Sequence, residues 1–246
     1  MVFCANFQAN FGLEVDLQGW TLKVYTRLVP AKNIIKEFVP EAYYHIYNRG
    51  VAKQKIFLDD QDYKTFLSYF KLYLTLPNLQ GPTLKVSPSR QLKNYFEQIK
   101  LLAYCLMPNH FHLFVFQQEA NNITNFMRSL ITKYSIYFNK KYQRVGPVFQ
   151  GNYKAVMVKT ENQFIYLSKY IHRNPLPLPT RLDLEGYKYS SYQNYLGRFS
   201  QTWVDKSEIL SYFSKINPAE SYQEFVEGID ERDLIMIKDQ MLDFDE

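Results

Sequence analysis

Residues 101–116, with the sequence LLAYCLMPNHFHLFVF, predict two β-strands joined by a tight turn. The first half, residues 101–107, is almost entirely apolar and ends at Pro108-Asn109, a dipeptide typical of turns. The second half begins at His110, and its aromatic and β-branched residues favour a buried strand over a helix. We therefore expect an antiparallel pair of strands at the centre of a sheet.

Two histidines open the second of these strands. Side chains on a strand alternate between faces, so His110 and His112 project to the same side about 6–7 Å apart. They are two of the four histidines in the chain. Among hydrophobic neighbours such a pair needs a polar partner. Either the two rings bind a metal ion, or they lie at a sheet edge and hydrogen-bond to the backbone; the spacing favours the metal.

Strand and helix patterns alternate along the rest of the chain. Thr160 with Gln163 is typical of a helix start, and Pro175 disfavours a helical residue before it. This order predicts an α+β fold, a ferredoxin-like antiparallel sheet with helices packed on one face. The expected elements are a strand at 43–47, a helix from Asp59 or Asp60 to about Leu74, a short helix near 91–100, a helix at 123–142, a strand at 148–159 and a helix at 161–173.

Composition limits the classes of protein that the chain can represent. Its 246 residues are 46% hydrophobic and 17% aromatic, as expected of a globular chain with a large core. No stretch approaches the roughly 18 apolar residues that cross a membrane. Two cysteines give no disulfide framework, which is expected of a reducing compartment. These features predict a cytoplasmic protein with no membrane partner.

Basic residues gather in one part of the chain. Residues 128–173 contain nine Lys or Arg against the single acid Glu161, a local net charge of +8 in a chain whose total is +5. Such a segment is a candidate surface for a polyanion. Residues 224–246 are the reverse, with nine acids and two basic residues, and are expected to be solvated and remote from nucleic acid.

The predicted helix at 161–173 carries a second candidate group. Tyr166, Tyr170 and Asn174 are spaced four apart and therefore share one face. A tyrosine one turn from a carboxamide can serve as a nucleophile beside a metal ligand. The spacing by itself favours the alternative, a tyrosine stripe that packs on the sheet.

Several separated motifs resemble those of the His-hydrophobic-His (HUH) single-tyrosine transposases. The residues concerned are YHIYNRG at 44–50, MPNHFHL at 107–113, GPVFQGNYK at 146–154 and YIHRNP at 170–175. They resemble most closely the insertion-sequence-200-like and REP-associated branches of that family. The similarity runs from about residue 29 to residue 197.

The resemblance implies an enzyme that cleaves and rejoins single-stranded DNA through a covalent 5′-phosphotyrosine. It implies Tyr170 as the nucleophile, and His110, His112 and Asn174 as ligands of Mg²⁺ or Mn²⁺. Tyr134 and Tyr137 are competing nucleophiles on the preceding basic helix. The expected partner is single-stranded DNA with hairpin-forming repeats, bound by a monomer or a homodimer. The residues expected to bind this DNA are Arg128, Lys133, Lys140, Lys141, Arg144, Lys154 and Arg173.

The sequence also permits a second function, and it divides the chain into three predicted segments. The alternative is a non-catalytic module that binds single-stranded nucleic acid by stacking bases on an RRM-like sheet. Residues 29–197 are expected to form the nuclease domain, and residues 198–246 an acidic helical C-terminal extension. Residues 1–28 are expected to be an appended or non-native segment without a packing role. Alternation at residues 20–25 suggests instead a genuine hairpin that pairs with a sheet edge.

Overall fold

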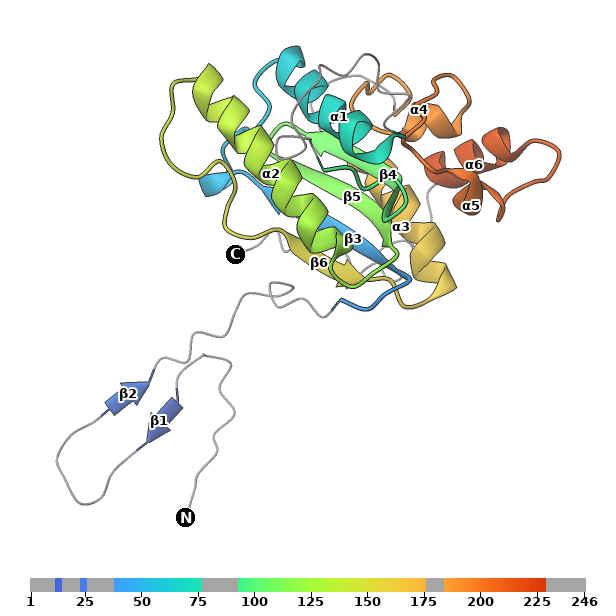
Figure 1. Ribbon diagram of the computed structural model, residues 1–246. Coiled ribbons are helices and arrows are strands. Elements are labelled where there is room, and N and C mark those ends of the chain that lie inside the picture. Colours follow the sequence, from blue (N-terminus) through green and yellow to red (C-terminus); the bar gives the residue numbers. More distant parts are fainter. Residues whose placement is uncertain (1–11, 15–22, 26–37, 77–92, 176–183, 229–246) are drawn as a thin grey trace.

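The computed structural model describes residues 12–14, 23–25, 38–76, 93–175 and 184–228. Its main body is built on a four-stranded antiparallel sheet in the order β4-β5-β3-β6 (Figure 1). The α+β class predicted from the sequence is confirmed. The strands are β3 (Ala42–Arg49), β4 (Ile99–Met107), β5 (His110–Gln117) and β6 (Lys154–Met157).

The strand pair predicted from residues 101–116 is the β4–β5 hairpin. Its turn is Pro108-Asn109, and Met107 pairs with His110 across it. β5 also pairs with β3 along its whole length, so β5 is a central strand. Neighbours on both sides satisfy the backbone of this apolar strand, which explains why a hydrophobic run is stable here.

Helices α1 (Asp60–Leu74) and α2 (Asn122–Lys141) cover one face of the sheet. Asp59 is the N-cap of α1 and forms a capping box with Asp62. Phe111, Leu113 and Val115 of β5 point into the core beneath these two helices. The predicted bounds of both helices agree with the structure to within one residue at each end.

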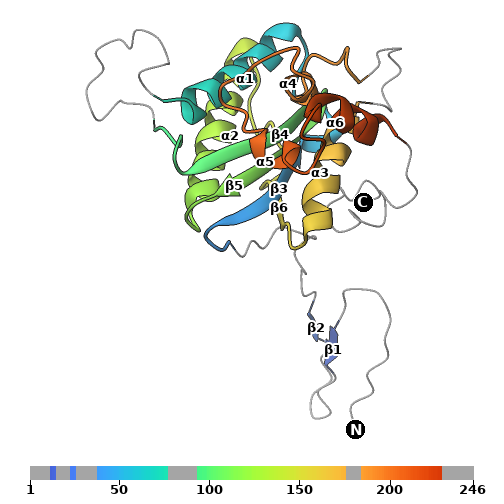
Figure 2. The ribbon, with the colours of Figure 1, turned by 90° about the vertical axis from the view of Figure 1, so that its right-hand side faces the viewer.

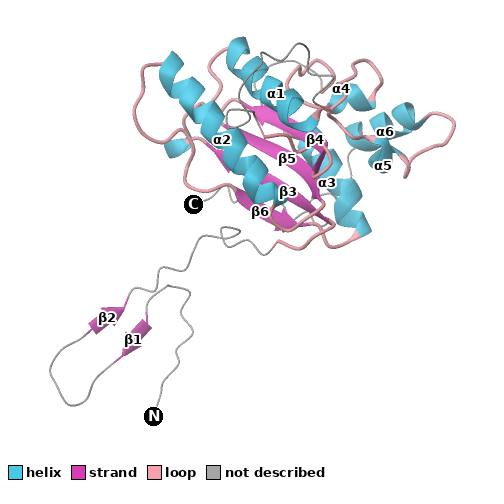
Figure 3. Ribbon diagram, in the orientation of Figure 1, coloured by secondary structure: helices cyan, strands magenta, loops and turns pink. Residues whose placement is uncertain are grey.

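Helix α3 (Glu161–Arg173) lies on the opposite face, where it contacts β4 and β5 (Figures 2 and 3). Thr160 caps it by accepting the Gln163 amide, and Asn174 ends it, as predicted. The expectation that all helices pack on one face is therefore wrong in this detail. Phe114 supplies the physical reason, because its apolar side chain projects to the α3 side and requires a second core.

Short helices after residue 183 complete this second layer. Ile209, Tyr222 and Val226 are buried against α3, and the Tyr195 hydroxyl donates to the Leu102 carbonyl of β4. The described part of the predicted C-terminal extension thus contributes to the core of the domain. The helices are α4 (Tyr192–Tyr195), α5 (Ser207–Leu210) and α6 (Pro218–Glu227).

Two further features differ from or extend the predictions. The helix expected near residues 91–100 is wrong over its described part, because residues 96–98 form a turn and β4 begins at Ile99. Near the N-terminus, β1 (Gly12–Glu14) pairs with β2 (Lys23–Tyr25) in a separate two-stranded sheet. The described residues of this hairpin do not pair with the main sheet.

Candidate active site

The register of β3 and β5 brings three histidines to one face of the sheet. Tyr47 pairs with His112 and Arg49 with His110, so these side chains project to the same side as His45, two residues before Tyr47. Helix α3 lies over this face, and Tyr170 contacts the rings of both His45 and His112. The structure therefore brings the predicted pair, the predicted tyrosine and an additional histidine together.

His110 faces the side-chain amide of Asn174 at the end of α3. Its Nδ1 lies 2.7 Å from Asn109 Oδ1, an acceptor, so Nδ1 carries the proton and Nε2 carries a lone pair. Asn174 donates its Nδ2 to the Tyr170 carbonyl at 3.0 Å, which turns its Oδ1 toward His110. His110 Nε2 and Asn174 Oδ1 are 3.5 Å apart. Two lone pairs that face each other in this way are suited to bind a cation.

His112 lies deeper than His110. It is fully buried, and its Nδ1 is 2.8 Å from Nε2 of His45, which is also fully buried. Its Nε2 has no hydrogen-bond partner among the residues that the structure describes. A buried nitrogen without a partner is costly, and a metal ion bound to it would remove that cost.

Tyr170 is positioned by the rings around it. Its ring meets His112 edge-on at a centroid distance of 5.4 Å, and His45 at 5.8 Å. Its hydroxyl oxygen is buried. The predicted spacing of four residues places Tyr170 one turn before Asn174, so both reach the histidines from the same side of α3.

The two competing tyrosines lie on the other side of the sheet. The Tyr134 hydroxyl donates to the Ile56 carbonyl in the core under α1 and α2. The Tyr137 hydroxyl donates to Asp62 at 3.0 Å. Burial also raises the pKa of Tyr134. Because the sheet separates both hydroxyls from the histidines, neither is placed to act with them.

Burial keeps the predicted ligands neutral. It lowers the pKa of His110 to about 4, an effect that Asn174 opposes and the charge of Arg49 reinforces. Burial lowers the pKa of His112 well below its ordinary value, and His110 and His45 lower it further. Imidazoles that are neutral at pH 7 offer lone pairs to a metal.

The donor set fits a divalent cation that also binds water or substrate oxygen. His110, His112 and Asn174 supply two ring nitrogens and one amide oxygen. No group of three or more His, Cys, Asp or Glu side chains among the described residues is arranged to hold a metal ion. A closed structural zinc site is therefore absent from this part of the chain, and an open site of the kind used with phosphate substrates fits better.

The predicted DNA-binding residues do not form one surface. Lys141 forms ion pairs with Asp59 and Asp62, and Lys133 lies over the rings of Tyr69 and Tyr73. These two cations stabilise the packing of α1 on α2, which reduces their availability to a ligand.

The remaining predicted DNA-binding residues also lie in different parts of the structure. Arg144 contacts Gln54, and Arg173 donates to the Val226 carbonyl at 2.7 Å. Lys154 pairs with Tyr47 across β3–β6, so it projects to the face that carries the histidines. Lys140 and Arg128 are exposed.

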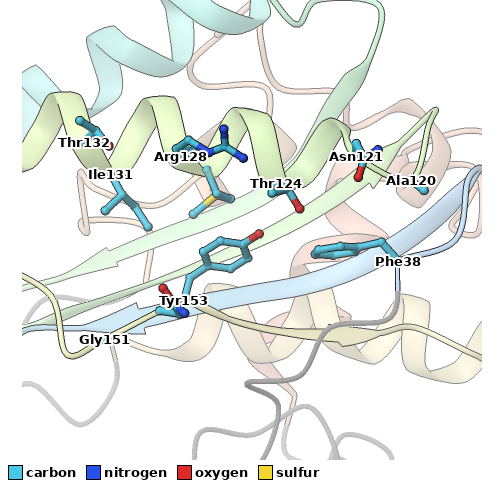
Figure 4. Close-up of a pocket in the computed structure, with 11 residues that line it drawn as sticks. Phe38, Ala120, Asn121, Thr124, Arg128, Ile131, Thr132, Gly151 and Tyr153 are labelled. Atoms are coloured by element: carbon cyan, nitrogen blue, oxygen red, sulfur yellow. The ribbon is translucent and has the colours of Figure 1, made fainter.

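Arg128 borders a cavity of about 610 Å³ between α2 and the segment before β6 (Figure 4). The ring of Tyr153 lies across this cavity with its hydroxyl directed at Thr124, and Phe38 borders the same space. Aromatic rings beside a guanidinium group are suited to an unpaired base and its phosphate. The cavity lies on the α2 side of the sheet, away from the histidines.

Sequence reasoning missed two residues of the site, His45 and Arg49. Both lie on β3 in a run where residues 45, 47 and 49 share one face by alternation. The alternation was readable from the sequence. The pairing of β3 with β5, which brings that face to His110 and His112, was not.

Comparison with known proteins identifies the segment that carries most of this site. Residues 88–174 match the protein-family model described as "Transposase IS200 like". This segment of the chain is similar to that family. His110, His112, Tyr170 and Asn174 lie within it, and His45 precedes it. The predicted family resemblance is confirmed here, together with the prediction of an enzyme of the transposase class.

Two of the solved structures that resemble this chain have low sequence identity to it. A structure of a REP-associated tyrosine transposase bound to a REP hairpin is 10% identical, with a TM-score of 0.48, and the match covers 70% of this chain and 93% of that one. A candidate transposase from Deinococcus radiodurans is 13% identical, with a TM-score of 0.34 and coverage of 56% and 94%. No curated protein matches. No helix among the described residues is long and apolar enough to span a bilayer.

Proposed function

We propose that this chain is a metal-dependent single-stranded DNA endonuclease and strand transferase that works through a covalent 5′-phosphotyrosine. The observation that carries the proposal is the position of Tyr170. Its ring packs against His112, and its helix presents the Asn174 oxygen to the lone pair of His110. A nucleophile and three candidate ligands from one chain therefore lie within one site.

In the proposed step the Tyr170 oxygen attacks the phosphorus of a scissile phosphodiester. The bond between phosphorus and the 3′ oxygen breaks, a proton is lost from the phenol, and the 3′ oxygen leaves as a hydroxyl after gaining a proton. The DNA stays attached to Tyr170 through its 5′-phosphate. Because the phosphodiester bond is exchanged rather than hydrolysed, the free 3′-hydroxyl of a strand can reverse the reaction without a nucleotide cofactor.

A phenol with an ordinary pKa near 10 is a weak nucleophile at pH 7 and requires nearby positive charge. His110, His112 and Asn174 would hold Mg²⁺ or Mn²⁺, which supplies that charge to the scissile phosphate. Nitrogen ligands favour Mn²⁺ over Mg²⁺ in binding assays. Arg49 and Lys154 project to the same face and would contact neighbouring phosphates.

The proposed partner is single-stranded DNA with hairpin-forming repeats. This assignment rests on the transposase motifs and on the separate cavity beside Arg128, which is suited to an unpaired nucleotide. Because Tyr170 and the histidines come from the same chain, a monomer would contain a complete site.

The alternative, a non-catalytic module that stacks bases on its sheet, is less well supported. Such a module needs an exposed sheet face with aromatic residues. Here α1 and α2 cover one face, and α3 covers the other. The sheet has no free face within the described residues on which bases could stack.

The proposal is tested with single-stranded oligonucleotides that carry a hairpin and flanking sequence, incubated with Mn²⁺ and analysed on denaturing gels. Wild-type protein should yield a covalent protein–DNA adduct. Tyr170→Phe should yield none and still bind the DNA. Tyr166→Phe is the matched control, because Tyr166 is one turn earlier on α3 and packs on Phe225. An adduct that persists in Tyr170→Phe would refute the assignment.

A further inference from the structure

His45 is a polar residue in the middle of a buried strand. It lies on β3 between Tyr44 and Ile46, both of which belong to the core. Its own side chain is fully buried on the opposite face. A buried imidazole is tolerated only with a hydrogen-bond partner, so its contacts define what it does.

The principal contact of His45 is with His112. The two rings are within 17° of parallel with centroids 5.1 Å apart, whereas His45 Nε2 and His112 Nδ1 are only 2.8 Å apart. The rings therefore meet through the edges that carry these nitrogens. This is the geometry of a ring-to-ring hydrogen bond.

Such a bond links the proton positions of the two rings. A neutral imidazole has one N–H and one lone pair, so one ring must donate and the other accept. If His112 donates its Nδ1–H, its Nε2 keeps a lone pair and can bind a metal. If His45 donates instead, His112 carries its proton on Nε2 and cannot be a ligand through that atom.

We propose that His45 is a positioning residue that accepts the Nδ1–H of His112 and thereby keeps His112 Nε2 available for the metal. This inference rests on the proposed function, since it assigns a role toward the proposed ion. The surroundings of His112 favour this direction. Its Nε2 has no hydrogen-bond partner among the described residues, and a metal ion bound to this nitrogen requires the lone pair that this direction leaves on it.

Ligating histidines in metalloproteins usually donate their second ring N–H to an acceptor, and loss of that acceptor typically weakens metal binding 10- to 100-fold. The acceptor is more often a carboxylate or a carbonyl. The acceptor proposed here is instead the ring nitrogen of a second, fully buried histidine.

The test uses two variants of similar size. His45→Gln retains an acceptor oxygen at the end of its side chain, whereas His45→Met fills the space without one. Mn²⁺ binding to the DNA-free protein is measured by titration calorimetry and by the decrease of the free-ion EPR signal. We expect about 10- to 100-fold weaker binding for His45→Met and a much smaller loss for His45→Gln.

A spectroscopic measurement on the wild-type protein separates positioning from general support of the fold. The ¹⁵N shifts of His112 in the metal-free protein should show a protonated Nδ1 and a bare Nε2. In His45→Met the proton should move to Nε2. Thermal unfolding of each variant monitors folding.

Three results would overturn the inference. These are wild-type Mn²⁺ affinity in folded His45→Met, an equal loss in both variants, or a His112 that carries its proton on Nε2 in the wild-type protein. The last measurement needs no variant, so a misfolded His45→Met does not remove the test. Absence of any Mn²⁺ binding by the wild-type protein would instead refute the proposed metal site itself.

Discussion

His110 and His112 are neighbours on one face of β5, but their surroundings differ. His110 is 8% exposed and is held by Asn109, whereas His112 is fully buried and bonded to His45. Alanine at either position should abolish tight Mn²⁺ binding. Only His112→Ala should also destabilise the fold, by about 1–3 kcal/mol, because it removes the hydrogen-bond partner of His45 Nε2 in the core.

Titration calorimetry and urea denaturation of the two variants check this difference. Equal stability losses would mean that the His45 bond contributes nothing to the fold. Undiminished Mn²⁺ affinity in both variants would exclude the pair as ligands.

At the residue scale, the sequence predicted the parts of the site that follow from local periodicity. Two-residue alternation placed His110 and His112 together, and four-residue spacing placed Tyr170 with Asn174. His45 could not be found this way, because it lies 67 residues from His112 in the chain. The local pattern of residues does not determine which strands pair.

At the scale of elements, Asp62 fixes the start of α1 to the end of α2. Its carboxylate accepts hydrogen bonds from Lys141 at 2.7 Å, from Tyr142 at 2.8 Å and from the Leu58 amide at 2.8 Å. Burial alone would raise the pKa of Asp62, but these bonds outweigh burial and lower the pKa below its ordinary value.

Asp62→Asn should destabilise the protein by about 2–3 kcal/mol at pH 7, less than the 3–5 kcal/mol of a fully buried pair, because Lys141 remains 26% exposed. The folded-state pKa is lowered, so this stabilisation is present above the ordinary pKa of an aspartate. It is lost as the pH falls through the folded value.

Urea unfolding across the acidic range checks the prediction, and the variant should show a flatter pH dependence than the wild type. Asp60→Asn is the control, since Asp60 pairs with Lys64 at the surface and should change stability little. A wild-type pH profile in Asp62→Asn would contradict the assignment.

Elements with clear caps were predicted well, and elements without them were not. Asp59 and Thr160 begin α1 and α3 as expected, and the turn at Pro108-Asn109 joins β4 to β5. The prediction of a helix near residues 91–100 is wrong because β4 starts at Ile99, where tertiary pairing with Gln117 overrides the local pattern.

At the scale of the whole molecule, the C-terminal helices are tied to the helix that carries Tyr170. His172 of α3 bonds to the Tyr222 hydroxyl of α6 at 2.7 Å, and Arg173 donates to the Val226 carbonyl at the end of α6. The end of the nuclease domain predicted at residue 197 would separate these C-terminal helices from α3. Composition alone could not show it, because the acids of residues 224–246 suggested a solvated tail.

A chain that ends at residue 197 should therefore melt at a markedly lower temperature, because Leu102 and Tyr195 lose their cover of apolar side chains. Removal of residues 2–28 is the matched truncation and should leave the melting temperature unchanged, since β1 and β2 pair only with each other among the described residues. Differential scanning calorimetry compares the two. Equal melting temperatures for the shortened and full chains would contradict the role of α6.

Charge is also a property of the whole surface. Affinity for single-stranded DNA should fall with salt, with a log–log slope of about −0.7 per neutralised phosphate. Arg128→Ala should make the slope less steep by about that amount if Arg128 binds one phosphate. Lys133→Gln is the control, because Lys133 lies over Tyr69 and Tyr73 in the α1–α2 packing. Identical slopes for wild type and Arg128→Ala would remove Arg128 from the DNA surface.

The most direct test of the central claim is to locate the covalent bond. The protein is incubated with a hairpin-bearing single strand and Mn²⁺, denatured and digested, and the DNA-linked peptide is identified by mass spectrometry. We expect a 5′-phosphate joined to the oxygen of Tyr170. A linkage to Tyr134 or Tyr137, or DNA that is cleaved without any covalent peptide, would contradict it.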